Sequence, residues 1–248
     1  MYLSPTSAGS GGAFTDLVDQ PYSAGGYSST YHRWASHIDP SRPIGMLIHL
    51  HGDGAFEYDN PVSPYCLGGP DGIVAQARVR NLIVIVPLTP DDDTRTWWNW
   101  SGTASNTQWL DALQTAILDA FDVDLGRLWY TAFSGGSQFL TKYYLPRFAN
   151  NAAGGGAVVF GGGNAPDTAV TPVDAGTRSR FTMHWLTGGD DVAANAADGF
   201  DGLAAAVGGE RWYRDAGFVT TLVTPPGHGH DWPNEFGPRC GEIFAAYL

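Results

Sequence analysis

The sequence predicts an α/β fold in which a mostly parallel central sheet carries helices on both faces. Short apolar runs alternate with segments of helical periodicity along most of the 248 residues, which is the pattern of repeated strand–helix units. Several of these runs are apolar throughout and show no alternation, so we expect strands that are covered on both faces. Polar clusters follow the runs, and open parallel sheets carry their sites at these carboxyl ends of the strands.

Two regions are expected along the chain. Residues 1–26 are rich in Gly, Ser, Thr and Ala and contain few apolar anchors, so we expect an arm that lies on the surface. Residues 27–248 contain no repeat, heptad run or linker, and we therefore expect a single domain there.

The individual elements follow from local patterns. Strands are expected where β-branched and aromatic residues form short runs bounded by Gly, Pro or Asp. Such runs occupy residues 27–36, 46–50, 82–87, 128–133, 157–160, 181–186 and 218–223. Helices are expected where apolar residues recur at helical spacing, as Leu110, Leu113 and Ile117 do. These segments are 71–80, 107–121, 137–144, 196–207, 210–216 and 240–248, and we expect the third of them to stop near Pro146.

The composition restricts the partners of the protein. With 25 acidic and 13 basic side chains the formal net charge is -12, which disfavours nucleic acid and anionic membranes and fits a neutral or cationic substrate. No apolar run approaches the roughly 18–20 residues of a membrane span, and no signal peptide is visible, so we expect a soluble protein. Secretion would require a leader removed from this chain, and the compartment and oligomeric state stay open.

The stretch 127–147 is typical of a nucleophile at a sharp turn. An apolar β-rich run, 128–133, leads into Ser134 and two glycines, and a helical pattern follows. The motif is close to G-x-S-x-G, with Ala132 at the position of the first glycine. Small neighbours are needed because the serine has a strained backbone and the strand and helix cross closely. Serine beside glycine is also common in ordinary turns, so the motif alone does not decide the function.

Three more polar clusters follow other strands. His51-Gly-Asp-Gly54 follows the run 46–50, Asp190 and Asp191 follow 181–186, and His228 and His230 follow the last strand. Acyl transfer requires a nucleophile, a base, a carboxylate that orients the base, and donors for the oxyanion. The clusters supply these groups in the chain order serine, acid, histidine. The residues themselves leave open which aspartate and which histidine take part.

At this point the chain resembles the α/β-hydrolase superfamily over most of residues 27–248. The segments Trp98-Asn-Trp100 and Gly227-His-Gly-His230-Asp-Trp-Pro233 are similar to those of one esterase group. That group contains polyhydroxybutyrate depolymerases, feruloyl esterases and acetyl xylan esterases. The departures are Ala132 and the N-terminal arm, and they leave the substrate open.

The resemblance implies an α/β-hydrolase fold and roles for single residues. Ser134 would be the nucleophile, His230 the base in preference to His228, and Asp191 the acid in preference to Asp190. The oxyanion would be bound by the backbone N–H groups of Asp53 and Gly135, with the Asp53 carboxylate pointing away. His51 would fix the loop by a hydrogen bond. By their positions on loops after strands, Trp97, Trp98, Trp100 and Trp232 are expected to form an aromatic wall of the substrate site, or else only to pack these loops, and His228 is expected to line the same site.

The resulting hypothesis is a serine esterase that hydrolyses carboxylic esters through an acyl-enzyme. The expected substrate is a small-molecule or polymer-attached ester, without a metal or another cofactor. Cys66 and Cys240 allow at most one disulfide and do not by themselves make a zinc site. A serine peptidase or acyltransferase would use the same residues, and a non-catalytic hydrolase-fold binding module is the alternative from another class. A missing catalytic residue would indicate the binding module, and none is missing.

Overall fold

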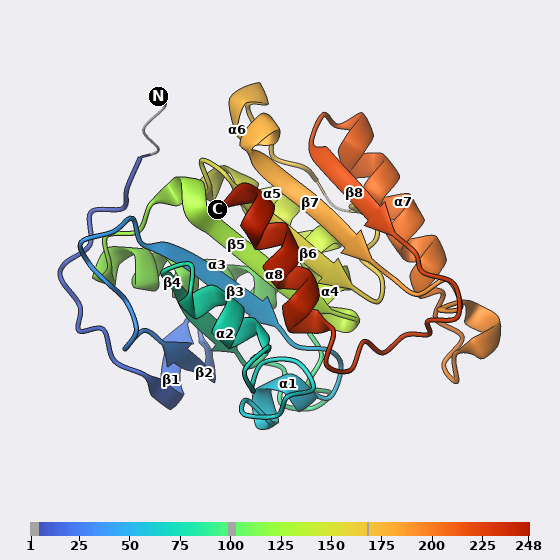
Figure 1. The fold of residues 1–248 in the computed structure, drawn as a ribbon, viewed down its shortest axis with the longest axis horizontal. Helices are drawn as coiled ribbons and strands as arrows, with labels where there is room; N and C mark the ends of the chain where they lie inside the picture. The colour runs from blue at the N-terminus through green and yellow to red at the C-terminus, as the bar shows by residue number, and fades with distance from the viewer. Residues whose placement is uncertain (1–4, 99–102, 168) are drawn as a thin grey trace.

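A single eight-stranded sheet forms the centre of the protein, in the order β1-β2-β4-β3-β5-β6-β7-β8. The computed structural model describes residues 5–98, 103–167 and 169–248. Strand β2 pairs antiparallel with both β1 and β4, and all other pairs are parallel (Figure 1). The strands are β1 (Leu17–Ala24), β2 (Tyr27–Trp34), β3 (Gly45–Leu50), β4 (Leu82–Pro87), β5 (Leu128–Phe133), β6 (Gly155–Phe160), β7 (Phe181–Leu186) and β8 (Val219–Val223). The predicted mostly parallel sheet is confirmed.

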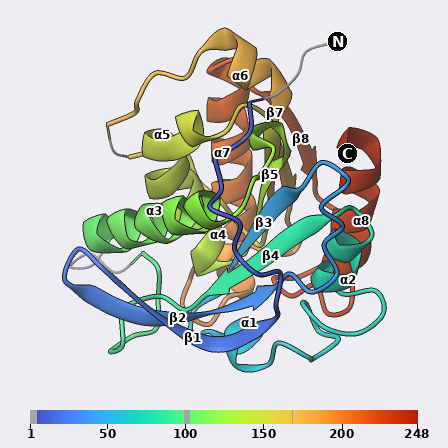
Figure 2. The ribbon, with the colours of Figure 1, turned by 90° about the vertical axis from the view of Figure 1, so that its left-hand side faces the viewer.

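Helices cover both faces of this sheet, as predicted. Figure 2 shows α3, α5 and α7 on one side of the sheet and α2 and α8 on the other. The helices are α1 (Phe56–Asp59), α2 (Ile73–Arg78), α3 (Thr103–Ala120), α4 (Gly135–Phe139), α5 (Leu145–Phe148), α6 (Ala175–Arg180), α7 (Gly202–Asp215) and α8 (Phe236–Tyr247). Helices α1 and α6 are short and were not predicted. No helix within the described ranges is long and apolar enough to cross a membrane.

Two apolar layers, one on each face, hold the sheet in place. In β3, Met46, Ile48 and Leu50 belong to the layer under α3, while Leu47 belongs to the layer under α2 and α8. Every residue of β3, β4, β5, β6 and β7 is buried, which explains why their sequences are apolar without alternation. Each buried aliphatic side chain contributes about 1.5–3 kcal/mol, so these strands form a rigid base for the loops at their ends.

Strand β1 was not predicted, because its sequence carries few signs of a strand. It contains Pro21, and Asp19 has a positive φ of 50° where the pairing with β2 shifts register. An edge strand tolerates both features, since only one of its sides needs hydrogen bonds. The segment 17–24, expected to be part of an irregular arm, therefore extends the sheet.

The α-helical segment after Ser134 ends at Phe148, close to Pro146 as predicted, although Pro146 itself lies inside the last helix. Helix α4 begins at Gly135, passes through a π-helical turn at Leu140–Tyr144 and continues as α5. Pro146 lies in the first turn of α5, where the wider π turn has already interrupted the regular hydrogen bonding. The missing proline N–H consequently costs little there.

The two helices predicted at 196–207 and 210–216 are one helix, α7, which begins only at Gly202. The prediction placed a break at Gly208 and Gly209, because glycine is a poor helix former. Gly209 is instead required by packing, since a Cβ at this position would overlap the carbonyl oxygen of Gly163. At Gly208 a Cβ would come no closer than 3.3 Å to another residue, the side chain of Asn164.

The two adjacent glycines provide a matched test of this packing. We expect Gly209→Ala to lower the free energy of unfolding by about 1–3 kcal/mol, because the backbone at Gly163 must move. Gly208→Ala should leave it unchanged or raise it by about 0.5–1 kcal/mol, since alanine favours the helix. Urea unfolding followed by circular dichroism measures both values. Equal effects of the two substitutions would contradict the close contact of α7 with Gly163.

Candidate active site

Ser134 lies at the sharp turn between β5 and α4, as the predicted strand–turn–helix requires. Its backbone has φ 50° and ψ -117°, which is a strained conformation for a residue other than glycine. The following helix passes very close to the end of β3. A Cβ at Gly136 would lie 2.5 Å from the carbonyl oxygen of Leu50 and 2.6 Å from that of His51. Glycine is therefore required where helix and strand cross, and the crossing holds Ser134 in its strained state.

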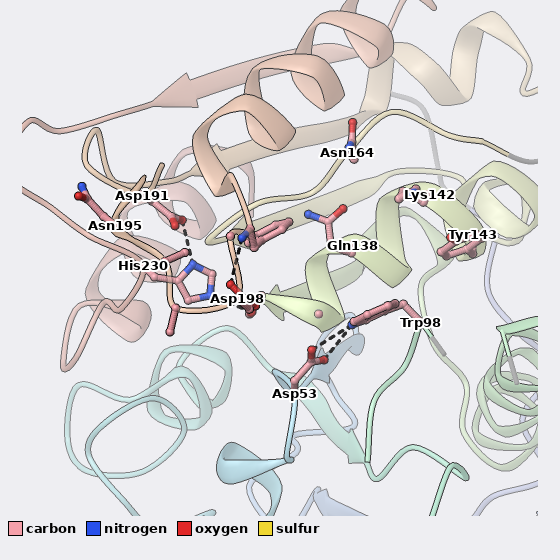
Figure 3. Close-up of a pocket in the computed structure, with 16 residues that line it drawn as sticks. Asp53, Trp98, Gln138, Lys142, Tyr143, Asn164, Asp191, Asn195, Asp198 and His230 are labelled. Carbon is pink, nitrogen blue, oxygen red and sulfur yellow. Dashed lines mark hydrogen bonds and ion pairs between the residues drawn. The ribbon is translucent and has the colours of Figure 1, made fainter. Parts of the chain in front are cut away.

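A continuous chain of hydrogen bonds joins Ser134 to His230 and Asp191. The Ser134 Oγ and His230 Nε2 atoms are 2.8 Å apart, and His230 Nδ1 is 2.9 Å from Asp191 Oδ2 (Figure 3). A carboxylate only accepts hydrogen bonds, so Nδ1 carries the imidazole proton and Nε2 is left to accept from the serine hydroxyl. The three side chains come from the ends of β5, β7 and β8, which are far apart in the sequence.

Asp191 is held at the N-terminus of α7. Only 3% of the residue is exposed, and a Cβ at Gly202 would overlap its carboxylate. The N-terminus of a helix carries partial positive charge, which favours a carboxylate at this point. Asp190 is exposed, and its hydrogen bonds among the described residues involve its backbone. Its N–H donates to the carbonyl of His228, and its carbonyl accepts from the side chain of Asn195. The structure thus brings Asp191 rather than Asp190 to His230.

The pKa of His230 is raised above its ordinary value of 6.5. Burial of the imidazole lowers the pKa, but the hydrogen bond and charge of Asp191 outweigh this effect, with further contributions from Asp231 and Asp198. Protonated His230 therefore adds to the stability of the fold below pH 6.5, and this contribution is lost as the pH rises through the raised value.

Two unpaired backbone donors lie next to Ser134. Within the described part of the chain, the N–H groups of Asp53 and Gly135 have no hydrogen-bond acceptor. Buried backbone N–H groups are almost always paired, so the open N–H of the buried Gly135 is unusual, whereas Asp53 is exposed. Gly135 also begins α4. The two donors are the ones that the sequence predicts for an oxyanion.

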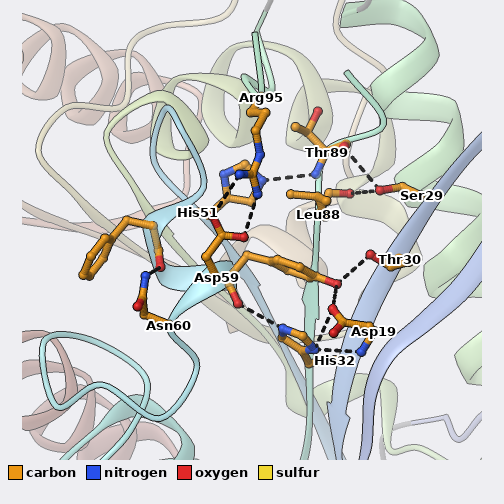
Figure 4. A network of polar contacts seen from close by, with 12 residues as sticks. Asp19, Ser29, Thr30, His32, His51, Asp59, Asn60, Leu88, Thr89 and Arg95 are labelled. Carbon is orange, nitrogen blue, oxygen red and sulfur yellow. Dashed lines mark hydrogen bonds and ion pairs between the residues drawn. The ribbon is translucent and has the colours of Figure 1, made fainter. Parts of the chain in front are cut away.

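The loop that carries Asp53 is fixed from behind by a polar network (Figure 4). His51 donates from Nδ1 to the carbonyl of Gly52 at 2.7 Å, and its Nε2 accepts from the N–H of Thr89 at 3.1 Å. The N–H of Gly52 donates to Glu57, 3.1 Å away. Burial lowers the pKa of His51 to about 4, so this ring is neutral at physiological pH. His51 fixes the loop, as expected, while Thr89 and Glu57 were not singled out in the sequence.

The Asp53 carboxylate does not point away from the site, contrary to the expectation. Both of its oxygens accept from the indole N–H of Trp98, at 3.0 and 3.1 Å. A Cβ at Gly135 would overlap Asp53 Oδ1, so the carboxylate lies directly against the first residue of α4. The expectation was wrong because the loop and Trp98 turn this side chain inward, and a loop sequence carries no periodicity that would show it.

These residues line a pocket of about 890 Å³. Its described walls contain Ser134, His230, Asp53 and Trp98. Gln138 of α4 and Lys142 and Tyr143 of the π-helical turn that follows also line it. The segment before α7 contributes residues 195–200, of which Phe200 packs its ring 6.0 Å from that of His230. This segment was predicted to be helical, so its part in the pocket could not be expected from the sequence.

The expected aromatic wall is only partly present. Trp98 is 38% exposed and lines the pocket, whereas Trp232 is fully buried against Phe160 and Phe236 in the layer under α8. The His228 ring packs against Trp232 at a tilt of 32°, its Nε2 lies 3.9 Å from Glu235 Oε1, and it is outside the pocket lining. A buried ring cannot contact a substrate, so the structure does not support the expected role of Trp232. Trp100 lies outside the described residues.

No cluster of His, Cys, Asp and Glu in the described ranges is suited to hold a metal ion. Cys66 and Cys240 are both buried and are not joined by a disulfide.

The fold is found among solved structures of hydrolases. A carboxylesterase from Bacillus cereus matches with a TM-score of 0.58 at 15% identity, over 85% of this chain and 91% of that one. A phospholipase/carboxylesterase from Dyadobacter fermentans matches with a TM-score of 0.59 at 14% identity, over 88% and 97%. SOBER1 from Arabidopsis thaliana matches with a TM-score of 0.55 at 15% identity, over 82% and 99%.

These likenesses show the fold, which is the α/β-hydrolase fold. No protein-family model matches the sequence, and no curated protein matches it.

The hydrogen bond between Asp191 and His230 is testable by titration. We expect Asp191→Asn to lower the pKa of His230 below its value in the unsubstituted protein, because the bond and the charge that raise it are both lost. NMR of the imidazole resonances measures the shift. Asp190→Asn is the matched control and should change this pKa much less. A larger effect of Asp190→Asn would show that the other aspartate faces the ring.

Proposed function

We propose that the protein is a serine esterase that hydrolyses carboxylic esters through an acyl-enzyme. The observation that carries this proposal is the hydrogen-bonded chain Ser134–His230–Asp191, which opens into a pocket beside two unpaired N–H groups. A nucleophile, an oriented base and donors for an oxyanion are the parts that acyl transfer requires. A protein that only binds a ligand would have no need of this alignment.

In the first half of the reaction, His230 takes the proton of Ser134 as the oxygen attacks the ester carbonyl. The oxyanion that forms is bound by the N–H groups of Gly135 and Asp53, a role supported by their lack of another acceptor among the described residues. Asp191 holds the imidazole in the required tautomer and stabilises its positive charge. The protonated His230 then gives its proton to the leaving alcohol, and the acyl group stays on Ser134.

In the second half, His230 deprotonates a water molecule that attacks the acyl-enzyme. The carboxylic acid leaves and Ser134 recovers its proton. His230 is partly exposed, with 35% of its side chain accessible, so water can reach it from the pocket. A peptidase or acyltransferase would share these steps. The names of the structural neighbours, carboxylesterase and phospholipase/carboxylesterase, favour an ester as the substrate.

Replacement of the nucleophile tests the proposal directly. We expect Ser134→Ala to reduce kcat on short p-nitrophenyl esters on the order of a million-fold, with a residual rate from the oxyanion donors. The substitution also relieves a strained turn, so circular dichroism and a thermal melt should confirm that the fold is kept. Near-normal hydrolysis by the folded variant would contradict the proposal that Ser134 is the nucleophile.

The two histidines of the last loop provide a matched control for the base. His230→Ala should reduce activity nearly as much as Ser134→Ala, because the serine loses its proton acceptor. His228→Ala should cost tenfold or less, on the order expected for a residue outside the pocket lining. The opposite ranking would place the base at position 228.

The raised pKa of His230 predicts the pH dependence. The base must be neutral to accept a proton, so kcat/KM should be low at acidic pH and rise with the loss of one proton at a value above 6.5. Rates on a neutral ester across the pH range give this value. In Asp191→Asn the remaining activity should rise at a lower pH. A midpoint well below 6.5 in the unsubstituted protein would contradict the assignment of His230 as the base.

A further inference from the structure

The Asp53 carboxylate stands where negative charge is unfavourable for the proposed reaction. Its Oδ1 atom lies against Gly135, whose N–H would bind the oxyanion. Two negative charges at close range repel each other, and the repulsion is strong where the surrounding protein reduces the dielectric constant. An ionised Asp53 would thus raise the energy of the tetrahedral intermediate unless a positive charge is also present.

Among the described residues, the imidazolium of His230 is the positive charge that forms together with the oxyanion, and Asp191 is already hydrogen-bonded to it. Within the described ranges Asp53 forms no ion pair, and both of its carboxylate oxygens accept from the neutral indole N–H of Trp98. Loss of hydration raises the pKa of Asp53; the Trp98 hydrogen bond and His230 oppose this rise, and the charge of Asp198 adds to it. Asp53 is an exposed residue of the pocket, so solvent compensates part of its charge, and a cation bound beside the carboxylate would compensate more of it.

A second carboxylate and an aromatic ring lie in the same part of the pocket. Asp198 also lines the pocket, and its charge acts on both Asp53 and His230. Figure 3 shows Asp198 between His230 and the pair Asp53–Trp98. Trp98 is 38% exposed, so part of its ring remains accessible. Carboxylates beside an accessible indole ring form a favourable environment for an ammonium group.

The permanent cation in the described lining is Lys142, and it does not compensate these carboxylates. Its Nζ atom forms an ion pair with Asp167 at 2.9 Å. Figure 3 places it beside Tyr143 and away from Asp198 and His230. The pocket consequently has an acidic side next to Ser134.

We propose that the preferred substrates are esters that carry a cationic group, such as an ammonium group, close to the scissile carbonyl. Asp53 and Asp198 supply the counter-charges and Trp98 supplies an apolar wall. The bound cation offsets the charge of Asp53 while the oxyanion forms, so it favours the transition state as well as binding. This inference rests on the proposed esterase function and names its substrate class.

Pairs of esters that differ only in charge test the inference. Acetylcholine and 3,3-dimethylbutyl acetate carry the charge difference in the alcohol part. Betaine ethyl ester and ethyl 3,3-dimethylbutanoate carry it in the acyl part. Acid release in a pH-stat at constant ionic strength gives kcat/KM for each ester. An α-ammonium group also activates the carbonyl of the betaine ester, so each kcat/KM is divided by the rate of alkaline hydrolysis of the same ester. After this correction we expect the cationic member of at least one pair to be favoured by about tenfold or more.

Substitution of Asp53 and Asp198 tests whether their carboxylates cause the preference for cationic esters. Asp53→Asn should reduce the ratio of cationic to neutral kcat/KM by about fivefold or more, and Asp198→Asn should also reduce it. The ratio is the readout, because a general loss of activity leaves it unchanged. Asp119→Asn removes one charge at an exposed position on α3 outside the pocket lining, and should not alter the ratio. Ratios below about threefold in both pairs, or ratios that Asp53→Asn leaves unchanged, would overturn the inference.

A failure of the cation preference can be distinguished from a failure of the proposed esterase function. Hydrolysis of the neutral esters that depends on Ser134, without any preference for the cations, would leave the esterase proposal standing and overturn the inference alone. If no ester is hydrolysed, the inference is still testable by binding. Calorimetric titration of Ser134→Ala with acetylcholine and with 3,3-dimethylbutyl acetate compares the two affinities. Tighter binding of acetylcholine that is lost on Asp53→Asn would support the cation site, and equal binding would overturn it.

Discussion

The close crossing of β5, α4 and the end of β3 is the constraint on which the site depends. Gly136 lets the helix approach the carbonyls of Leu50 and His51, and this contact keeps Ser134 at a positive φ of 50°. Such strain costs about 1–3 kcal/mol and persists only where the surroundings are rigid. The rigidity comes from β5, which is fully buried between β3 and β6. The same turn carries Gly135, the first residue of α4, directly after the serine.

Helix α7 organises the other half of the site. Its first residue, Gly202, packs against the Asp191 carboxylate, and Gly209 packs against the backbone at Gly163. Because the helix is continuous, these two contacts fix the acid relative to the end of β6. The segment before the helix brings Phe200 and Asp198 to the side of His230. One element thus positions the proposed acid and forms one wall of the pocket.

Two aspartates of the site differ in environment, and the difference separates their roles. Asp191 is 3% exposed, carries a hydrogen bond to His230 and faces a helix N-terminus, so its charge is compensated within the protein. Asp53 is exposed, and among the described residues its carboxylate accepts only from the neutral Trp98 indole. In the proposed reaction Asp191 orients the base, and in the proposed substrate preference Asp53 interacts with the charge of the substrate.

The sequence alone determined the α/β class, most of the strands and the position of Ser134. Strand hydrophobicity and the serine–glycine turn depend on neighbours along the chain, so a local pattern reveals them. Its resemblance to a known superfamily also selected Asp191 and His230. The three-dimensional structure decided what depends on contacts between distant segments: the inward carboxylate of Asp53, the burial of Trp232 and the continuity of α7 through Gly209. Loop side chains carry no periodicity, and their direction is set by the residues they meet across the fold.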